Sequence, residues 1–144
     1  LLPLLLENAD AAMVSGIIPK RAFPFSIVAF KKAPFSPDPI SLLLHPNTGV
    51  KEVDGCAMGC TLINLEKLQQ LPKPYFYDTA DRRSDLNLCH DLRARGERIL
   101  VDTRAMAGHS PLPRTIWPDD AQELRELSVR FMLSEGRATC DKLG

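Results

Sequence analysis

The sequence lacks any pair of cysteines separated by two residues, the spacing that zinc ribbons and thioredoxin-like proteins use. Its four cysteines also match no disulfide scaffold of a small domain; they are Cys56, Cys60, Cys89 and Cys140. Cysteines used in neither way are mostly buried free thiols, which persist in a reducing compartment. We therefore expect a cytoplasmic protein whose cysteines are reduced.

The sequence also has no excess of charge of either sign and no long apolar run. Lys+Arg and Asp+Glu both number 18, so the formal net charge is zero. A balanced charge gives no long-range attraction to nucleic acid or to an anionic membrane. The longest apolar runs fall far short of the roughly 18 residues that a transmembrane helix needs. We therefore expect neither a nucleic acid polymer as partner nor a transmembrane segment.

What the sequence does contain is an alternation of strand and helix patterns within 144 residues, which is enough for one domain. Apolar spacing, turn residues and helix caps predict the individual elements. Strands are expected over residues 12–18, 25–30, 40–44, 50–53, 75–77 and 99–101, and helices over 2–9, 62–71, 85–95 and 118–134. This alternation is typical of an α/β layer structure.

Gly59 belongs to the first of three segments of chemical interest. It lies between an expected strand that ends at Val53 and an expected helix that begins near Leu62. A glycine turn at a helix N-terminus can present backbone N–H groups to an oxygen-rich ligand. A tight strand-to-helix turn without a ligand explains the same residues more simply. For this segment alone, we favour the structural explanation.

Asp85 belongs to the second segment, in the first turn of the helix that is expected after Ser84. Ser84 is a suitable N-cap, and Gly96 is a suitable C-terminal stop. The helix dipole favours a charged carboxylate at this end of a helix, so Asp85 is suited to accept a proton. A capped helix start without catalytic function is the simpler explanation of this segment alone.

His109 ends the third segment, in which Gly108 follows the strand expected around Val101. A neutral imidazole in a loop is a good ligand for a divalent metal ion. A single histidine is more often a structural residue. A small metal-binding domain that uses His45, His90, His109 and the cysteines is a further alternative, although the spacing of these residues argues against it.

The order and spacing of these segments resembles the C-terminal, acceptor-side half of family-2-like GT-A glycosyltransferases, over about residues 1–110. The matching motifs are Gly59-Cys60-Thr61-Leu62-Ile63, Pro74-Tyr75-Phe76, Ser84-Asp85-Leu86-Asn87-Leu88-Cys89, Arg93-Ala94-Arg95-Gly96, Val101-Asp102 and His109. The resemblance implies a partial GT-A-like mixed sheet flanked by helices, with the N-terminal nucleotide-binding half missing. Residues 111–144 would form a loop and a C-terminal packing helix outside the resemblance.

The same resemblance implies transfer of a sugar from a nucleotide-diphosphate donor to an acceptor hydroxyl, for example that of a glycan. Asp85 would be the general base. His109 would bind Mn²⁺ or Mg²⁺, which would assist departure of the diphosphate. The residues expected to contact the substrates are Met58, Gly59, Cys60 and Ser84.

Two departures from the family pattern bear on these expectations. Ser84 stands where the family has the first carboxylate of a Glu-Asp pair, so only Asp85 carries over as the base. No Asp-x-Asp motif, which holds the metal and the sugar diphosphate in such enzymes, occurs in the chain. We therefore expect the isolated chain to be inactive or very weak. The alternative is a noncatalytic glycan-binding or oligomerising module derived from a GT-A half, which could form a homo-oligomer.

Overall fold

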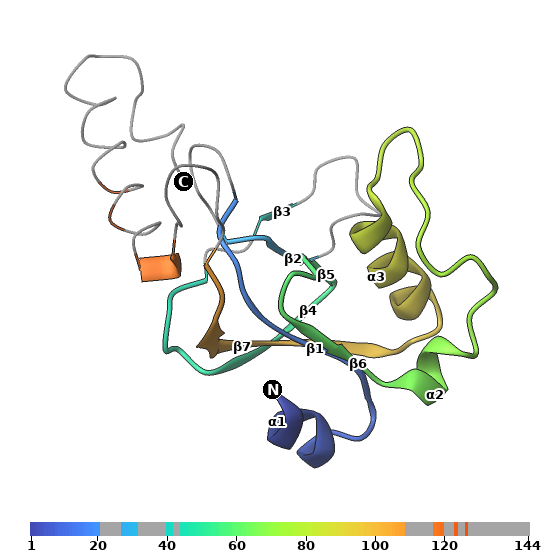
Figure 1. Ribbon diagram of the computed structural model, residues 1–144, viewed down its shortest axis with the longest axis horizontal. Coiled ribbons are helices and arrows are strands. Elements are labelled where there is room, and N and C mark those ends of the chain that lie inside the picture. The colour runs from blue at the N-terminus through green and yellow to red at the C-terminus, as the bar shows by residue number, and fades with distance from the viewer. Residues whose placement is uncertain are drawn as a thin grey trace.

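A mixed four-stranded sheet forms the centre of the protein in a computed structural model (Figure 1). The structure describes residues 1–20, 27–31, 40–41, 44–108, 117–119, 123 and 126. Its elements are α1 (Leu2–Glu7), β1 (Ala11–Ile17), β2 (Ala29–Lys31), β3 (Ile40–Ser41), β4 (Val50–Val53), β5 (Gly55–Cys56), β6 (Thr61–Ile63), α2 (Leu65–Leu68), α3 (Ser84–Ala94) and β7 (Arg98–Met106). This arrangement confirms the expected α/β class.

The larger sheet has the strand order β4-β7-β1-β6. β1 and β7 run parallel at its centre, whereas β4 pairs antiparallel with β7 and β6 pairs antiparallel with β1. Every residue of β1 is buried, as expected for a central strand that is covered on both faces. A smaller antiparallel sheet has the order β3-β2-β5.

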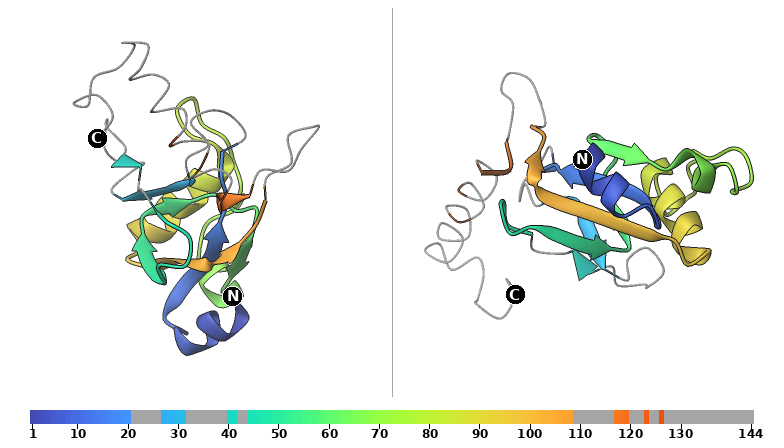
Figure 2. Two further views of the ribbon diagram at one scale, coloured as in Figure 1. Left: turned by 90° about the vertical axis from the view of Figure 1, so that its left-hand side faces the viewer. Right: turned by 90° about the horizontal axis from the view of Figure 1, so that it is seen from below.

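Helices cover both faces of the larger sheet, with α1 on one face and α3 with the smaller sheet on the other (Figures 1 and 2). Leucines of α1 pack against a small cluster that contains Val14 of β1 and Leu100 of β7. The main core, on the α3 face, contains Met13, Leu92 and Ile99. Because successive strand residues point to opposite faces, the two central strands supply both clusters. This arrangement fixes α3 on the side away from α1.

The helix predicted over residues 62–71 is wrong in its first part. Thr61–Ile63 form β6, which is hydrogen-bonded to β1. Asn64 then caps the short helix α2, because its side-chain oxygen accepts the backbone N–H of Glu66 at 3.1 Å. Leucines spaced by three residues produce the helical pattern, but pairing with a buried central strand overrides it. Gly59 therefore precedes a strand, and no helix N-terminus follows it.

Residues 75–77, which were expected to form a strand, lie in an irregular segment before α3. Their polar groups bond to α3 instead of to another strand. The Nδ2 atom of Asn87 donates to the carbonyl oxygen of Tyr77 at 2.7 Å, and the Tyr77 hydroxyl donates to Asp91 at 3.0 Å. Aromatic residues favour strands, but this segment instead packs along α3 and is hydrogen-bonded to it.

Of the strands expected over residues 25–30 and 40–44, the structure shows the shorter strands β2 (Ala29–Lys31) and β3 (Ile40–Ser41). The strands expected around residues 12–18, 50–53 and 99–101 and the helices expected around 2–9 and 85–95 are present with shifted ends. Gly96 follows α3 with a φ of 80°, the left-handed conformation that favours glycine at a helix C-terminus. Within the final helix expected over 118–134, Pro118, Asp119, Glu123 and Glu126 are helical, and the others lie outside the described residues. None of the described helices is long and apolar enough to cross a bilayer.

Candidate functional site

The start of α3, which carries Asp85, is held by a carboxylate from the preceding loop. The Oδ1 atom of Asp78 accepts the backbone N–H of Ser84 at 2.7 Å. Arg83 occupies the N-cap position without a capping bond from its own side chain, so the prediction that Ser84 is the N-cap is wrong. Ser84 is the first residue of the helix instead. A negative charge is favoured at a helix N-terminus, which explains why Asp78 replaces the expected serine hydroxyl.

Asp85 is half-buried in the first turn of α3, and its two carboxylate oxygens differ in their bonding. Oδ1 accepts the backbone N–H of Leu86 at 2.9 Å. Among the residues that the structure describes, Oδ2 has no hydrogen-bond partner. The carboxylate is thus oriented through one oxygen, while the other is left to accept a proton or a hydrogen bond.

Cys56 of β5 and Cys89 of α3 lie together in the core, with the Sγ atom of Cys89 3.7 Å from the carbonyl oxygen of Cys56. A hydrogen bond with the Cys89 thiol, followed by burial and then by the nearby Asp85 carboxylate, raises the pKa of the Cys56 thiol well above its ordinary value. Both side chains are fully buried and unoxidised. Because a reactive cysteine must be accessible to its substrate and both side chains are shielded from solvent, we do not assign catalysis to these cysteines. They pack α3 against β5.

The predicted substrate residues Met58, Gly59 and Cys60 lie in the turn from β5 to β6. The carbonyl oxygen of Cys60 accepts the backbone N–H of Gly16 at 2.8 Å. The buried hydroxyl of Ser15 lies 3.1 Å from the carbonyl oxygens of both Cys60 and Ala57. These bonds attach both ends of the turn to the end of β1, so its backbone is fixed before any ligand binds.

Glycine at position 59 is required neither by an unusual backbone angle nor by a rigid neighbour, because the atom nearest an added Cβ is the end of the Ile18 side chain, which can rotate away. A Cβ atom at this position would lie 2.7 Å from the Cδ1 atom of Ile18. Gly59 itself is exposed, whereas Met58 and Cys60 are half-buried. The expectation that a helix dipole acts at Gly59 is wrong, since the next element is β6. Any ligand contact made here uses backbone and side chains of a strand-to-strand turn.

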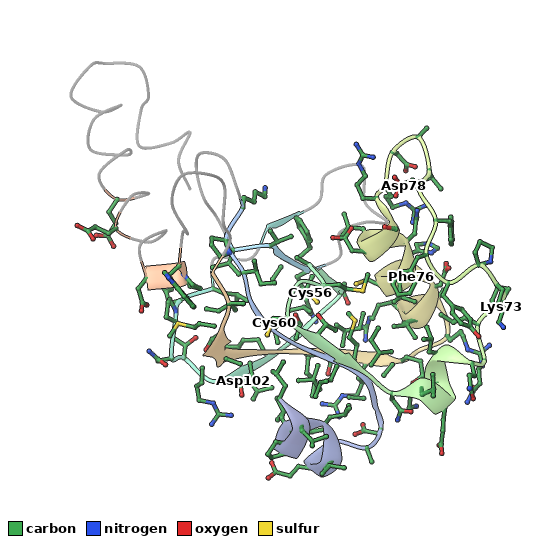
Figure 3. The ribbon with its side chains drawn as sticks, viewed as in Figure 1. Cys56, Cys60, Lys73, Phe76, Asp78 and Asp102 are labelled. Carbon is green, nitrogen blue, oxygen red and sulfur yellow. The ribbon has the colours of Figure 1, made fainter. Side chains whose placement is uncertain are left out.

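Cys56 connects the two predicted parts of the site. Its carbonyl oxygen lies 3.7 Å from the Sγ atom of Cys89 in α3, and Met58 follows Cys56 by two residues along the chain. The side chain of Leu86 also packs over Gly55, where an added Cβ atom would lie 3.4 Å from Leu86 Cδ2. Figure 3 shows Cys56 and Cys60 on the α3 side of the larger sheet. The structure therefore places the start of α3 and the beginning of the 58–60 turn around the same short strand, β5.

Asp102, which belongs to one of the family motifs, lies on the other side of the sheet from Cys56 and Cys60 (Figure 3). Arg104 makes two side-chain bonds to its carboxylate, at 2.9 Å and 3.0 Å. These bonds lower the pKa of Asp102, with burial opposing them. The carboxylate is thus paired within β7 and does not join Asp85.

The predicted metal ligand His109 lies outside the described residues, so its position relative to Asp85 stays a prediction. Within the described part of the chain, no group of three histidine, cysteine or acidic side chains could hold a metal ion. His90 Nδ1 lies 3.1 Å from a carboxylate oxygen of Asp91, and His45 is exposed. These positions give no support to a metal-binding domain built from the histidines and cysteines.

Two residues that support the site were not identified from the sequence. Asp78 caps α3 from six residues upstream, and Asn87 is buried within α3 and holds the loop at Tyr77. A buried asparagine on the apolar side of a helix needs bonding partners, so the position of Asn87 beside Leu88 was a usable signal. The contribution of Asp78 depends on how the loop folds back, and no local pattern indicates it.

We expect Asp78→Ala to weaken the start of α3 and to lower the free energy of unfolding by about 1 kcal/mol. The loss arises because the N–H of Ser84 loses its acceptor. Urea unfolding followed by circular dichroism would measure it. Asp78→Asn, which keeps an acceptor oxygen, is the matched control and should lose less. Equal stability of the alanine variant and the wild type would contradict the capping function.

Comparison with known proteins gives a fold and no family. No protein-family model and no curated protein sequence matches the chain. The crystal structure of A197 from STIV is similar in structure, with a TM-score of 0.59 and 19% sequence identity. The match covers 83% of this chain and 54% of A197, so the chain spans about half the length of that protein. At this identity the similarity shows the fold alone.

Proposed function

We propose that this chain is the acceptor-side half of a GT-A-fold glycosyltransferase in which Asp85 is the general base. The observation that carries the proposal is the carboxylate of Asp85, half-buried at the start of an eleven-residue helix and bonded through only one oxygen. The mixed sheet and the motifs around Asp85 support it. The fold similarity to A197 says nothing of activity.

In this proposal, Asp85 takes the proton of an acceptor hydroxyl while that oxygen attacks the anomeric carbon of the donor sugar. The bond from that carbon to the diphosphate breaks as the new bond forms, so the anomeric centre inverts. A positioned general base of this kind contributes about 10²–10⁴-fold in rate. Met58–Cys60 and Ser84 would border the reacting sugars.

A divalent ion, Mn²⁺ or Mg²⁺, would stabilise charge on the departing diphosphate when bound. His109 is the ligand that this chain would contribute. The described residues contain no further ligand group, and the sequence contains no Asp-x-Asp. The chemistry that we assign to this chain is therefore limited to proton transfer and to binding of the acceptor.

The proposal is tested by comparing two polypeptides, the isolated chain and the product of the complete reading frame that contains it. Each is incubated with Mn²⁺, a panel of nucleotide sugars and simple glycan acceptors, and release of nucleoside diphosphate is measured. We expect turnover by the complete product and none, or very little, by the isolated chain, because the isolated chain has no Asp-x-Asp. Normal turnover by the isolated chain would contradict its assignment as half of a site. Absence of turnover by a complete product that contains an Asp-x-Asp motif would contradict the glycosyltransferase proposal.

A noncatalytic oligomerising module is the second candidate, and the edge of the larger sheet is the observation that favours it. β6 is an edge strand, and its residues Thr61–Ile63 are half-exposed and uncharged. The opposite edge strand, β4, carries Lys51 and Glu52. Charged side chains discourage strand addition at an edge, whereas an uncharged edge permits it. Light scattering after size-exclusion chromatography would show a dimer under this candidate and a monomer otherwise.

A further inference from the structure

Arg82 lies in the loop before α3, three residues before Asp85, and its backbone is firmly held. Its N–H donates to the hydroxyl of Thr79 at 3.2 Å, and its carbonyl oxygen accepts the N–H of Thr79 at 2.8 Å. The Nδ2 atom of Asn87 also approaches that oxygen at 3.4 Å. These hydrogen bonds therefore fix the position of the Arg82 backbone, and with it the Cα atom from which the side chain extends.

The guanidinium of Arg82 is half-buried, and two of its nitrogen atoms lack a hydrogen bond of good geometry. Its Nε and Nη1 atoms are shielded from solvent and have no hydrogen-bond partner among the residues that the structure describes. Asp81 supplies the nearby anion, with 3.5 Å between its Oδ2 atom and Arg82 Nε. A guanidinium stays charged at all ordinary pH values and has five N–H groups to satisfy. Buried polar groups without partners are rare and call for an explanation, and an absent ligand is one.

The surrounding charges indicate which ligand would suit this arginine. Residues 78–85 contain three carboxylates, those of Asp78, Asp81 and Asp85, and two guanidinium groups, those of Arg82 and Arg83. The second guanidinium is already bonded to Asp78 at 3.1 Å. An anionic ligand would therefore meet a loop of net negative charge. Uncharged hydroxyl groups fit this loop better. The oxygen of a hydroxyl accepts a hydrogen bond from the guanidinium, and its O–H donates one to a carboxylate.

We propose that Arg82 binds neighbouring hydroxyl oxygens of an uncharged sugar, which is the acceptor of the reaction. A planar guanidinium can donate two roughly parallel bonds to adjacent oxygens. The side chain of Asp81, which is 73% exposed, would move aside to admit the sugar. The inference rests on the proposed function, and it adds that the acceptor is neutral and is held from the side of the loop before α3.

The experiment observes the side-chain Nε–H of Arg82 by ¹⁵N NMR in the full chain. Arg82→Gln assigns the signal, because the signal disappears in that variant. The protein is titrated with neutral hexoses and disaccharides, with glucuronate as the charged counterpart, and with inorganic phosphate. Arg83→Gln is the matched control, since Arg83 is adjacent but its side chain is 85% exposed. Circular dichroism establishes that both variants are folded.

We expect at least one neutral sugar to shift the Arg82 Nε–H signal together with the backbone amides of Asp85 and residues 58–60. Arg82→Gln should weaken binding of that sugar by about tenfold or more, because a bond to a charged group is lost, and Arg83→Gln should leave it unchanged. Shifts at Asp85 without a shift at Arg82 would overturn the inference and leave the proposed function intact. A response to phosphate or glucuronate alone, or to no probe at all, would also overturn it. Turnover of nucleotide sugars tests the proposed function separately.

Discussion

Replacing Asp85 by Asn in the product of the complete reading frame is expected to lower the rate of sugar transfer by about 10²–10⁴-fold. Asparagine has nearly the same shape, and its side-chain oxygen can still accept the N–H of Leu86, as Oδ1 of Asp85 does at 2.9 Å. It cannot take up the proton of an acceptor hydroxyl. The loss should therefore fall on kcat, with KM for the donor little changed.

The control for this variant is Asp10→Asn, because Asp10 is exposed and bonds to Arg98, away from α3. Its activity should equal that of the wild type. Unfolding by urea should give similar free energies for both variants, which would separate lost chemistry from lost structure. Full activity of Asp85→Asn would contradict the assignment of Asp85 as the general base.

The central part of the fold could be predicted because its signals are local and strong. β1 reads as a continuous apolar run that ends before Pro19, and it is buried along its whole length. The helix that carries Asp85 has an apolar stripe and a glycine stop at Gly96. Patterns of this kind act within a few residues, so the sequence alone expresses them.

The features that were predicted incorrectly depend on partners that are distant in the sequence. A helix was predicted for Thr61–Ile63 because leucines recur every three residues from Leu62 onward. In the structure these residues form a strand, because they pair with β1. The N-cap at Ser84 was wrong because Asp78 reaches the same N–H from six residues away. Local propensity is a weak guide wherever a tertiary bond competes with it.

In the candidate site, too, the features with local signals could be predicted and those that depend on distant contacts could not. The position of Asp85 in the first turn of a helix is predicted from the sequence and confirmed by the structure. The environment of Met58–Cys60 could not be predicted, because it depends on hydrogen bonds to Ser15 and Gly16, in a strand some 45 residues earlier. The incomplete hydrogen bonding of the Arg82 guanidinium could not be predicted either. An arginine in a charged loop looks solvated from its sequence, and only the folded loop shows that two of its nitrogen atoms are buried.

Gly16→Ala is expected to lower the free energy of unfolding by about 1–3 kcal/mol, as overpacking of a well-packed interior does. Gly16 is buried near the end of β1. An added Cβ atom would lie 2.6 Å from the backbone carbonyl oxygen of Ala105 and 3.2 Å from the sulfur of Cys60. A backbone oxygen of a paired strand cannot rotate away as the end of a side chain can. β7 or the 58–60 turn must therefore shift.

Gly55→Ala is the matched control, because Gly55 is also buried in a strand but its Cβ atom would have its nearest contact at 3.4 Å, with a side-chain carbon of Leu86. Urea unfolding should show a clearly larger loss for Gly16→Ala than for Gly55→Ala, and the backbone amide signals of residues 58–60 should move in the former. Because Gly16 accounts for the close approach of the 58–60 turn to β1, the same substitution should also weaken any sugar binding that involves this turn. Equal stability of the two variants would show that the turn adapts and that its fixed position is not required.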